Sequence, residues 1–78
     1  MFKSLINYIK DKDYLIGIYN DEIYIYNYKN IIDINNEYIK INLGNKKVKI
    51  QGENICVKKL ENSEVLIKID IKGLNFYE

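Results

Sequence analysis

The residues best suited to binding chemistry in this sequence are three tyrosines, Tyr24, Tyr26 and Tyr28, which occupy every second position. In an extended strand, residues at this spacing lie on one face, so the three rings would form a row opposite Ile23 and Ile25. A row of exposed aromatic rings suits a partner protein, a glycan or stacked bases. The alternative, which the small size of the domain favours, is that the rings cover a second face of a thin core.

Polar groups follow directly after this tyrosine row. Asn27, Lys29 and Asn30 flank Tyr28 at the point where the strand is expected to end. Two amides and a lysine at such a point can cap a turn or present hydrogen-bonding groups to a partner, and turn capping is the favoured role. The candidate interaction residues are therefore Tyr24, Tyr26, Asn27, Tyr28 and Lys29.

Few residues in this chain suit catalysis or metal binding. His, Trp, Pro, Ala, Thr and Arg are absent, and Cys56 is the single cysteine. This composition excludes, within the chain, an imidazole general base, a His-containing zinc site and an intramolecular disulfide. Cys56 lies between two aliphatic residues, so we expect a buried, unreactive thiol. We predict a protein that is not an enzyme and that uses no cofactor and no metal.

The charge balance gives little reason to expect nucleic acid or a membrane surface as a partner. Twelve lysines against 11 acidic residues leave a formal net charge of +1, which is too small to steer the whole molecule toward a polyanion. A local basic patch could form from Lys40, Lys47, Lys49 and Lys68, although a solvated face is the favoured interpretation. We expect a cytoplasmic protein, because a lone cysteine suits a reducing compartment and no apolar run approaches a transmembrane length.

The chain is expected to consist of an N-terminal helix and linker at residues 1–13 and a single β-domain at residues 14–78. The helix is predicted from an apolar stripe with helical spacing, formed by Phe2, Leu5, Ile6 and Ile9. We expect this stripe to pack on the mouth of the β-domain, with a peripheral membrane contact as the alternative. From Tyr14 onward, apolar residues alternate with polar ones, which predicts strands.

A first hairpin is predicted from the agreement between turn chemistry and apolar register. A two-residue loop at Asn20-Asp21 pairs Ile18 with Ile23 and Ile16 with Ile25, which gathers four isoleucines on one face. The loop residues tolerate the positive φ angles that tight hairpin turns require. The turn and the core pattern therefore predict the same hairpin.

A second hairpin is predicted around Gly44-Asn45. Its register pairs Ile41 with Val48 and sets Lys40 directly opposite Lys49. Like charges in such a pair repel each other, so we expect this side of the hairpin to face water.

Further connections are predicted at Asn35-Asn36, which pairs Ile32 with Ile39, and at Gly52–Asn54 and Glu61–Ser63. Strands that follow one another through such short turns must be antiparallel. The predicted fold is all-β: an antiparallel meander of six to seven short strands, forming a small sandwich or a partly open barrel, with a short N-terminal amphipathic helix.

Four regions of the β-domain match a known pattern: IYNYKNI at residues 25–31, YIKI at residues 38–41, VKIQGENI at residues 48–55, and LIKIDI followed by LNF within residues 66–76. Together they resemble the YabP/YqfC family of sporulation proteins, and the YqfC branch more closely. Most matching positions are alternating aliphatic residues. The more specific matches are Asn27, Tyr28, Lys29, Gly52 and Asn54. The sequence departs from the family where Ile69 replaces a typical glycine, and where the Gly44 hairpin is about two residues longer.

The resemblance implies a non-enzymatic sporulation protein of the mother cell that works with a membrane-bound sporulation partner. Such a protein would lie in the mother-cell cytoplasm, held near a membrane by that partner. Self-association through sheet edges is also expected, because long strands with few edge-breaking residues readily pair. Two alternatives stay open: a small β-barrel that binds single-stranded nucleic acid or a glycan, and a small protein inhibitor encoded by a mobile element.

Overall fold

The computed structural model describes residues 14–78, and the helix expected within residues 1–13 lies outside this described part. Residues 14–78 form six β-strands and no helix, so this part contains no helix that could cross a membrane. The strands, in chain order, are β1 (Leu15–Tyr19), β2 (Glu22–Tyr26), β3 (Asn30–Ile34), β4 (Tyr38–Asn42), β5 (Lys47–Glu61) and β6 (Glu64–Tyr77).

The six strands form one antiparallel sheet in the order β1-β2-β6-β5-β4-β3, and the sheet is not closed. The predicted all-β antiparallel class is confirmed. Two strands are longer than predicted: β5 has 15 residues and β6 has 14. Their length was not predicted because polar residues interrupt the apolar alternation at the point where both strands bend.

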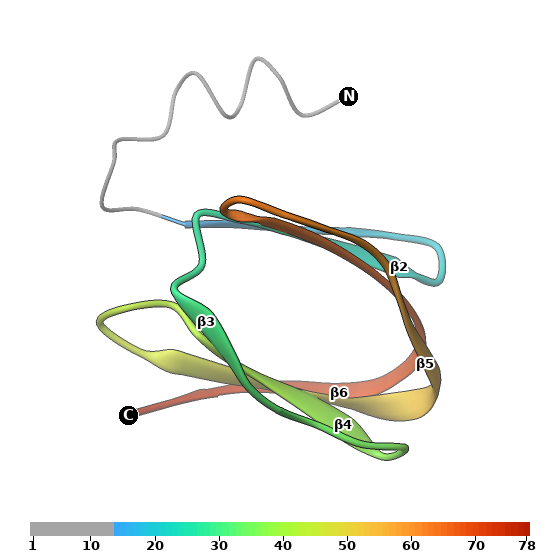
Figure 1. The fold of residues 1–78 in the computed structure, drawn as a ribbon. Coiled ribbons are helices and arrows are strands. Elements are labelled where there is room, and N and C mark those ends of the chain that lie inside the picture. Colours follow the sequence, from blue (N-terminus) through green and yellow to red (C-terminus); the bar gives the residue numbers. More distant parts are fainter. Residues whose placement is uncertain (1–13) are drawn as a thin grey trace.

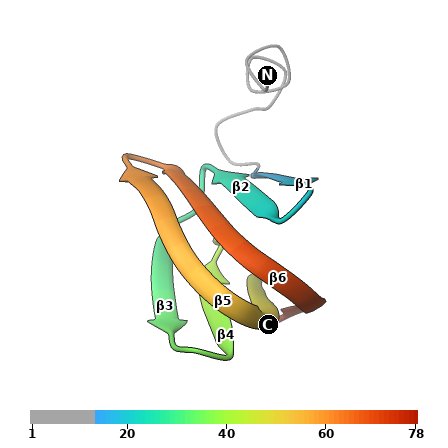
Figure 2. The ribbon, with the colours of Figure 1, turned by 90° about the vertical axis from the view of Figure 1, so that its right-hand side faces the viewer.

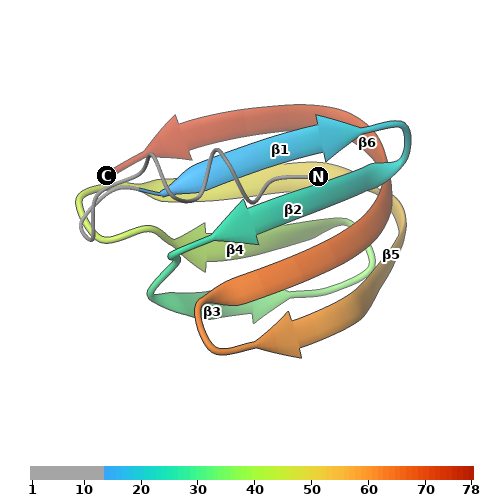
Figure 3. The same ribbon diagram turned by 90° about the horizontal axis from the view of Figure 1, so that it is seen from above.

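The long β5–β6 hairpin bends so that its two halves lie in two facing layers (Figures 1 and 2). The upper layer of Figure 1 contains β1 and β2 with the start of β6 and the end of β5. The lower layer contains β3 and β4 with the start of β5 and the end of β6. Figure 3 shows β1 and β3 on opposite sides of the molecule, each at an edge of its layer. One open sheet therefore covers its own inner face.

The hydrophobic core fills the space between these two layers. Because successive side chains of a strand point to opposite faces of the sheet, every second residue faces this space. Complete burial of one such isoleucine contributes about 2 kcal/mol to stability. The buried residues are Ile23, Ile25, Ile39, Ile41, Leu43, Val48, Ile50, Val65, Ile67 and Ile69.

The bend of the long hairpin lies next to Gly52. The pairing between β5 and β6 shifts between Gln51 and Gly52, and again twice before Lys59. Such bulges add an unpaired residue to one strand, which bends it and increases its twist. The predicted corner at Gly52–Asn54 is therefore a bend within one continuous strand, and Asn54 takes a positive φ of 56° there.

The two hairpins predicted first have the expected registers. Ile18 pairs with Ile23 across the first turn, and Ile41 pairs with Val48 across the second.

The predicted pairing of Ile32 with Ile39 is wrong, because Ile34 pairs with Ile39 instead. The Oδ1 atom of Asn35 accepts hydrogen bonds from the backbone nitrogens of Glu37 and Tyr38, at 2.8 and 3.0 Å. This capping closes the turn one residue later than predicted, and a bulge between Ile31 and Asp33 shifts the register once more.

Candidate interaction surface

The outer side of the upper layer carries an apolar and aromatic surface, here called the tyrosine face. Its rows follow from the strand registers: Leu15 lies beside Tyr26, and Gly17 lies beside Tyr24, which in turn lies beside Leu66. These residues alternate along their strands with the buried isoleucines of the core, so they point away from it. The tyrosine face consists of Leu15, Gly17, Tyr19, Tyr24, Tyr26 and Leu66.

Tyr24 is held in place on this face by a carboxylate. Its hydroxyl donates a hydrogen bond of 2.6 Å to Oε1 of Glu64. Burial raises the pKa of the Tyr24 hydroxyl above its ordinary value, and the hydrogen bond and the negative charge of Glu64 raise it further. The hydroxyl therefore stays protonated, as a donor, throughout the physiological pH range.

Charged residues surround this apolar centre. Glu64 lies between two neighbours: it pairs with Tyr26 of β2 on one side and with Glu61, at the end of the long hairpin, on the other. The nearby ion pairs are exposed and therefore weak: Lys58–Glu22 at 3.1 Å, Lys59–Glu61 at 3.6 Å and Lys68–Asp21 at 3.8 Å. The end of the face beside Tyr26 thus carries the carboxylate of Glu64 next to an aromatic ring, with the Lys59–Glu61 pair beyond it.

Tyr28 does not belong to the tyrosine face, although the alternation predicted that it would. Strand β2 ends at Tyr26, and Asn27 takes a left-handed φ of 65°. This reversal breaks the two-residue period, and Tyr28 packs against the hydrophobic core instead. The predicted row of three tyrosines is therefore a pair, Tyr24 and Tyr26.

Residues 27–29 connect the upper layer to the lower one. The backbone nitrogen of Asn27 donates to the carbonyl of Ser63 in the β5–β6 turn, at 2.6 Å. The backbone nitrogen of Lys29 donates to the carbonyl of Asn42 at the end of β4, at 2.8 Å. These two backbone hydrogen bonds tie the connection to both layers, and the turn-capping role of the Asn27 and Lys29 side chains stays a prediction.

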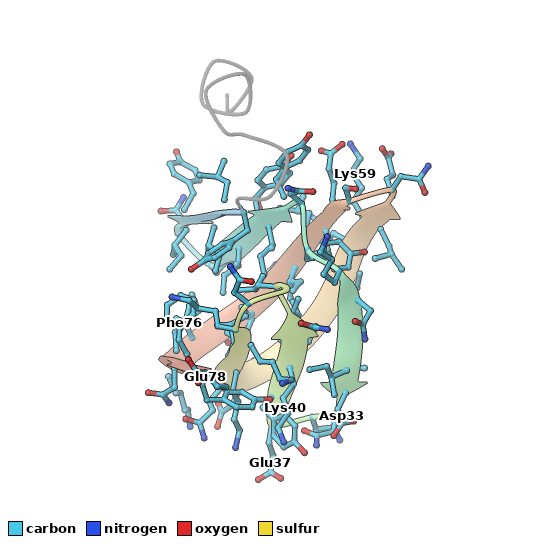
Figure 4. The ribbon with its side chains drawn as sticks, turned by 90° about the vertical axis from the view of Figure 1, so that its left-hand side faces the viewer. Asp33, Glu37, Lys40, Lys59, Phe76 and Glu78 are labelled. Atoms are coloured by element: carbon cyan, nitrogen blue, oxygen red, sulfur yellow. The ribbon has the colours of Figure 1, made fainter. Side chains whose placement is uncertain are left out.

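The four lysines considered for a basic patch lie on two different surfaces. Lys40, Lys47 and Lys49 are on the outer side of the lower layer, whereas Lys68 pairs with Glu22 on the upper layer. In Figure 4, Lys40 lies on the lower layer, at the opposite end of the view from Lys59 on the upper layer. The predicted grouping fails because the bend in β6 takes Lys68 into the other layer.

Lys40 lies directly opposite Lys49, as predicted. Both ammonium groups lie over the ring of Tyr38, at 5.2 and 4.6 Å from its centroid. The Tyr38 hydroxyl donates to Oδ2 of Asp33 at 3.0 Å, which fixes the ring. Attraction to the ring face offsets part of the repulsion between the two cations.

Cys56 is exposed, not buried as predicted. The bulge between Glu53 and Cys56 shifts the alternation of β5, and Cys56 then pairs with the outward-facing Lys68. Among residues 14–78, no three His, Cys, Asp or Glu side chains lie close enough to bind a metal ion.

A polar hollow of about 400 Å³ lies on the lower layer, lined by Asn36, Glu37, Gln51, Gly52, Glu53 and Lys72. The ammonium group of Lys72 is paired with Glu53 at 2.8 Å. Small-molecule sites are usually apolar with a few converging polar groups, and this lining does not have that character.

Four members of the tyrosine face, Leu15, Gly17, Tyr19 and Leu66, were not predicted as candidates. Leu15 and Tyr19 lie on the same side of the first hairpin as Tyr24, so the correctly predicted register already contained the signal for them. Leu66 joins the face through the pairing of β2 with β6, a contact between distant segments that no local pattern reveals.

No family model matches this chain, and neither the curated proteins nor the solved structures that were compared with it contain a match. The resemblance to the YabP/YqfC family therefore stays a prediction from the residues quoted above.

The hydrogen bond between Tyr24 and Glu64 gives a testable pH dependence. Replacing Tyr24 by phenylalanine should lower the free energy of unfolding by about 1 kcal/mol at neutral pH. Since folding raises this pKa, the stabilisation is complete below the unfolded value near pH 10 and is lost as the pH rises through the folded pKa.

Denaturant titrations at several pH values would show the difference between the wild type and Tyr24→Phe shrinking above about pH 10. Tyr26→Phe is the control, because Tyr26 lies on the same face as Tyr24 and takes no part in this hydrogen bond. A difference that stays constant up to pH 11, roughly one unit above the ordinary tyrosine pKa, would contradict this role of Tyr24.

Proposed function

We propose that this protein is a non-enzymatic binding protein whose tyrosine face docks a partner protein. The observation that carries the proposal is an apolar, aromatic outer face on a sheet whose inner face already forms the core. A sheet needs only one buried face to fold, and among residues 14–78 this second apolar face has no part in the core. Aromatic residues at the centre and charged residues at the rim are typical of protein interfaces.

The charges around the face indicate the chemistry of the partner. Glu64 lies beside Tyr26 and accepts the Tyr24 hydrogen bond, whereas Glu61, on the far side of Glu64, is paired with Lys59. A partner segment with apolar side chains and a neighbouring lysine or arginine would complement this surface.

The process we propose is sporulation, with the protein in the mother-cell cytoplasm and a membrane-bound sporulation protein as its partner. The support for this part is the sequence resemblance, whose more specific residues include Asn27, Tyr28 and Gly52. In the structure Tyr28 contacts the core and Gly52 lies at the bend. The residues that carry the resemblance are thus largely those that shape the domain.

Site-specific photocrosslinking in the host cell tests the docking proposal. A photoreactive phenylalanine analogue is placed at Tyr26 or, as the matched control, at Tyr77, which ends β6 on the outer side of the lower layer. We expect Tyr26, and not Tyr77, to crosslink to one host protein. With that protein purified, Tyr26→Ser should weaken binding at least about tenfold. Equal crosslinking at both positions, or none at Tyr26, would count against the tyrosine face.

A further inference from the structure

Four strand edges are unpaired within residues 14–78: β1, β3, the second half of β5 and the second half of β6. Natural proteins protect such edges with charges and bulges. Strand β3 carries Asp33 and a bulge, the end of β5 carries Lys58, Lys59 and Glu61, and the end of β6 carries Asp70 and Lys72. Strand β1, with the sequence LIGIY, has neither a charge nor a bulge.

The backbone groups of β1 alternate in direction. The first turn is a two-residue loop with a positive φ of 55° at Asn20, and it closes on the pair Tyr19 and Glu22. In an antiparallel hairpin of this kind, the pair that closes the loop is hydrogen-bonded, and hydrogen-bonded pairs then alternate with non-hydrogen-bonded pairs along the two strands. Residues 15, 17 and 19 therefore bond to β2, whereas Ile16 and Ile18 direct their N–H and C=O groups toward the open edge.

We infer that β1 pairs with β1 of a second copy of this chain, antiparallel, around a twofold axis at Gly17. In this register Ile16 lies opposite Ile18 of the second copy, and the twofold axis repeats the pair. Each of these two pairs exchanges both of its backbone hydrogen bonds, which gives four in total. Gly17 meets Gly17 of the second copy in a non-hydrogen-bonded pair, where strands approach to about 4.5 Å between Cα atoms.

The pairing covers apolar surface that is otherwise in contact with water. Ile18 is 55% exposed and Tyr19 is 58% exposed. Across the twofold axis, Ile18 would lie beside Ile16, and Tyr19 beside Leu15, of the second copy. No charged side chain of β1 comes near the axis, so no like charges are brought together.

The strength of the dimer follows from its size. Two five-residue strands and the side chains next to them bury less than about 1,200 Å², which is the range of weak and transient interfaces. We therefore expect a concentration-dependent dimer rather than a permanent one. Pairing at β1 would join the two sheets edge to edge and place two tyrosine faces next to each other, so a partner with two docking segments would gain avidity.

This inference extends the proposed function by adding a second copy as a partner, and it concerns a different surface. Photocrosslinking at Tyr26 does not depend on β1 pairing, and the mass of the protein in solution does not depend on the docked partner. Failure of one proposal is therefore distinguishable from failure of the other.

Sedimentation of the full chain over a range of concentrations tests the inference. The wild type should pass from monomer to dimer as its concentration rises, whereas Ile18→Lys, which places a charge beside the twofold axis, should stay monomeric at every concentration. The control is Ile32→Lys on the β3 edge, at a site that is also exposed, at 42%, and it should dimerise like the wild type. A thermal melt of each variant confirms that it is folded.

Disulfide trapping provides the second readout. Gly17→Cys, combined with Cys56→Ser to remove the exposed native thiol, should form a covalent dimer on mild oxidation. The expected Cα separation of about 4.5 Å lies within the range that a disulfide spans. Ile32→Cys in the same background should not crosslink. A wild type that stays monomeric at all concentrations, or a Gly17→Cys variant that crosslinks no better than Ile32→Cys, would overturn the inference.

Discussion

Replacing Gly52 by alanine is expected to destabilise this domain more than any other substitution of a single small residue. A Cβ atom at this position would overlap the backbone oxygen of Asp70 and would lie 2.7 and 2.8 Å from two side-chain carbons of Ile69. Gly52 is buried at the bend of the long hairpin, so neither neighbour can move without opening the β5–β6 pairing. We expect a loss of about 3 kcal/mol or more in the free energy of unfolding, which is a large part of the stability of a small domain.

The matched control for this prediction is Gly73→Ala. Gly73 lies on the neighbouring strand, paired with Gln51, and an added Cβ would meet only the end of the flexible Gln51 side chain, at 3.2 Å. We expect Gly73→Ala to cost less than about 1 kcal/mol. Urea titration followed by circular dichroism would measure both variants. Equal stability of Gly52→Ala and the wild type would show that the hairpin does not bend as described.

Truncating Ile67 to alanine is expected to have the second-largest effect. Ile67 is completely buried and lies at the centre of the upper layer, paired with Ile23 on one side and Val57 on the other. Removing three carbon atoms there leaves a cavity that the surrounding strands fill only in part, at a cost of about 3 to 4 kcal/mol. In a domain of this size, such a loss lowers the melting temperature by more than about 12 °C.

Ile32→Ala is the control for Ile67→Ala, because Ile32 lies on the β3 edge and is exposed, at 42%. Its truncation should lower the free energy of unfolding by less than about 1 kcal/mol. Differential scanning calorimetry on the two variants gives the comparison directly. Similar melting temperatures for both would mean that the core does not lie between the two layers.

The parts of the fold that the sequence predicts well are local. The hairpin at Asn20-Asp21 was predicted because a two-residue turn and the apolar alternation on either side of it require the same register. The hairpin at Gly44-Asn45 follows for the same reason. The third hairpin was placed wrongly, because the side chain of Asn35 caps its turn one residue later than the apolar pattern indicates.

The parts that sequence patterns miss depend on contacts between distant segments. The pairing of β2 with β6 joins residues that are more than 40 positions apart at Tyr24 and Leu66, and neither local alternation nor turn chemistry contains this information. The bulges in β5 also depend on pairing with another strand, β6. They bend β5 around the core and turn Cys56 outward.

In the candidate site, too, local patterns predict one part and contacts or backbone conformations that they do not reveal determine the rest. The alternation of β2 placed Tyr24 and Tyr26 on one face correctly, whereas the left-handed backbone at Asn27 removed Tyr28 from it. An asparagine tolerates that conformation better than most residues, but its type alone does not require it. The pairing of β2 with β6, which local patterns do not reveal, completes the tyrosine face by placing Leu66 and Glu64 beside the two rings.

The most direct measurement of the central claim is a complementation assay for spore formation. In the host organism, deletion of the gene should lower the spore count, and the wild-type gene and Tyr77→Ser should restore it. Tyr26→Ser, made at the same level and with a melting temperature close to that of the wild type, should fail to restore it, because the docking contact of the tyrosine face is lost. Full restoration by Tyr26→Ser, or a normal spore count in the deletion strain, would contradict the account.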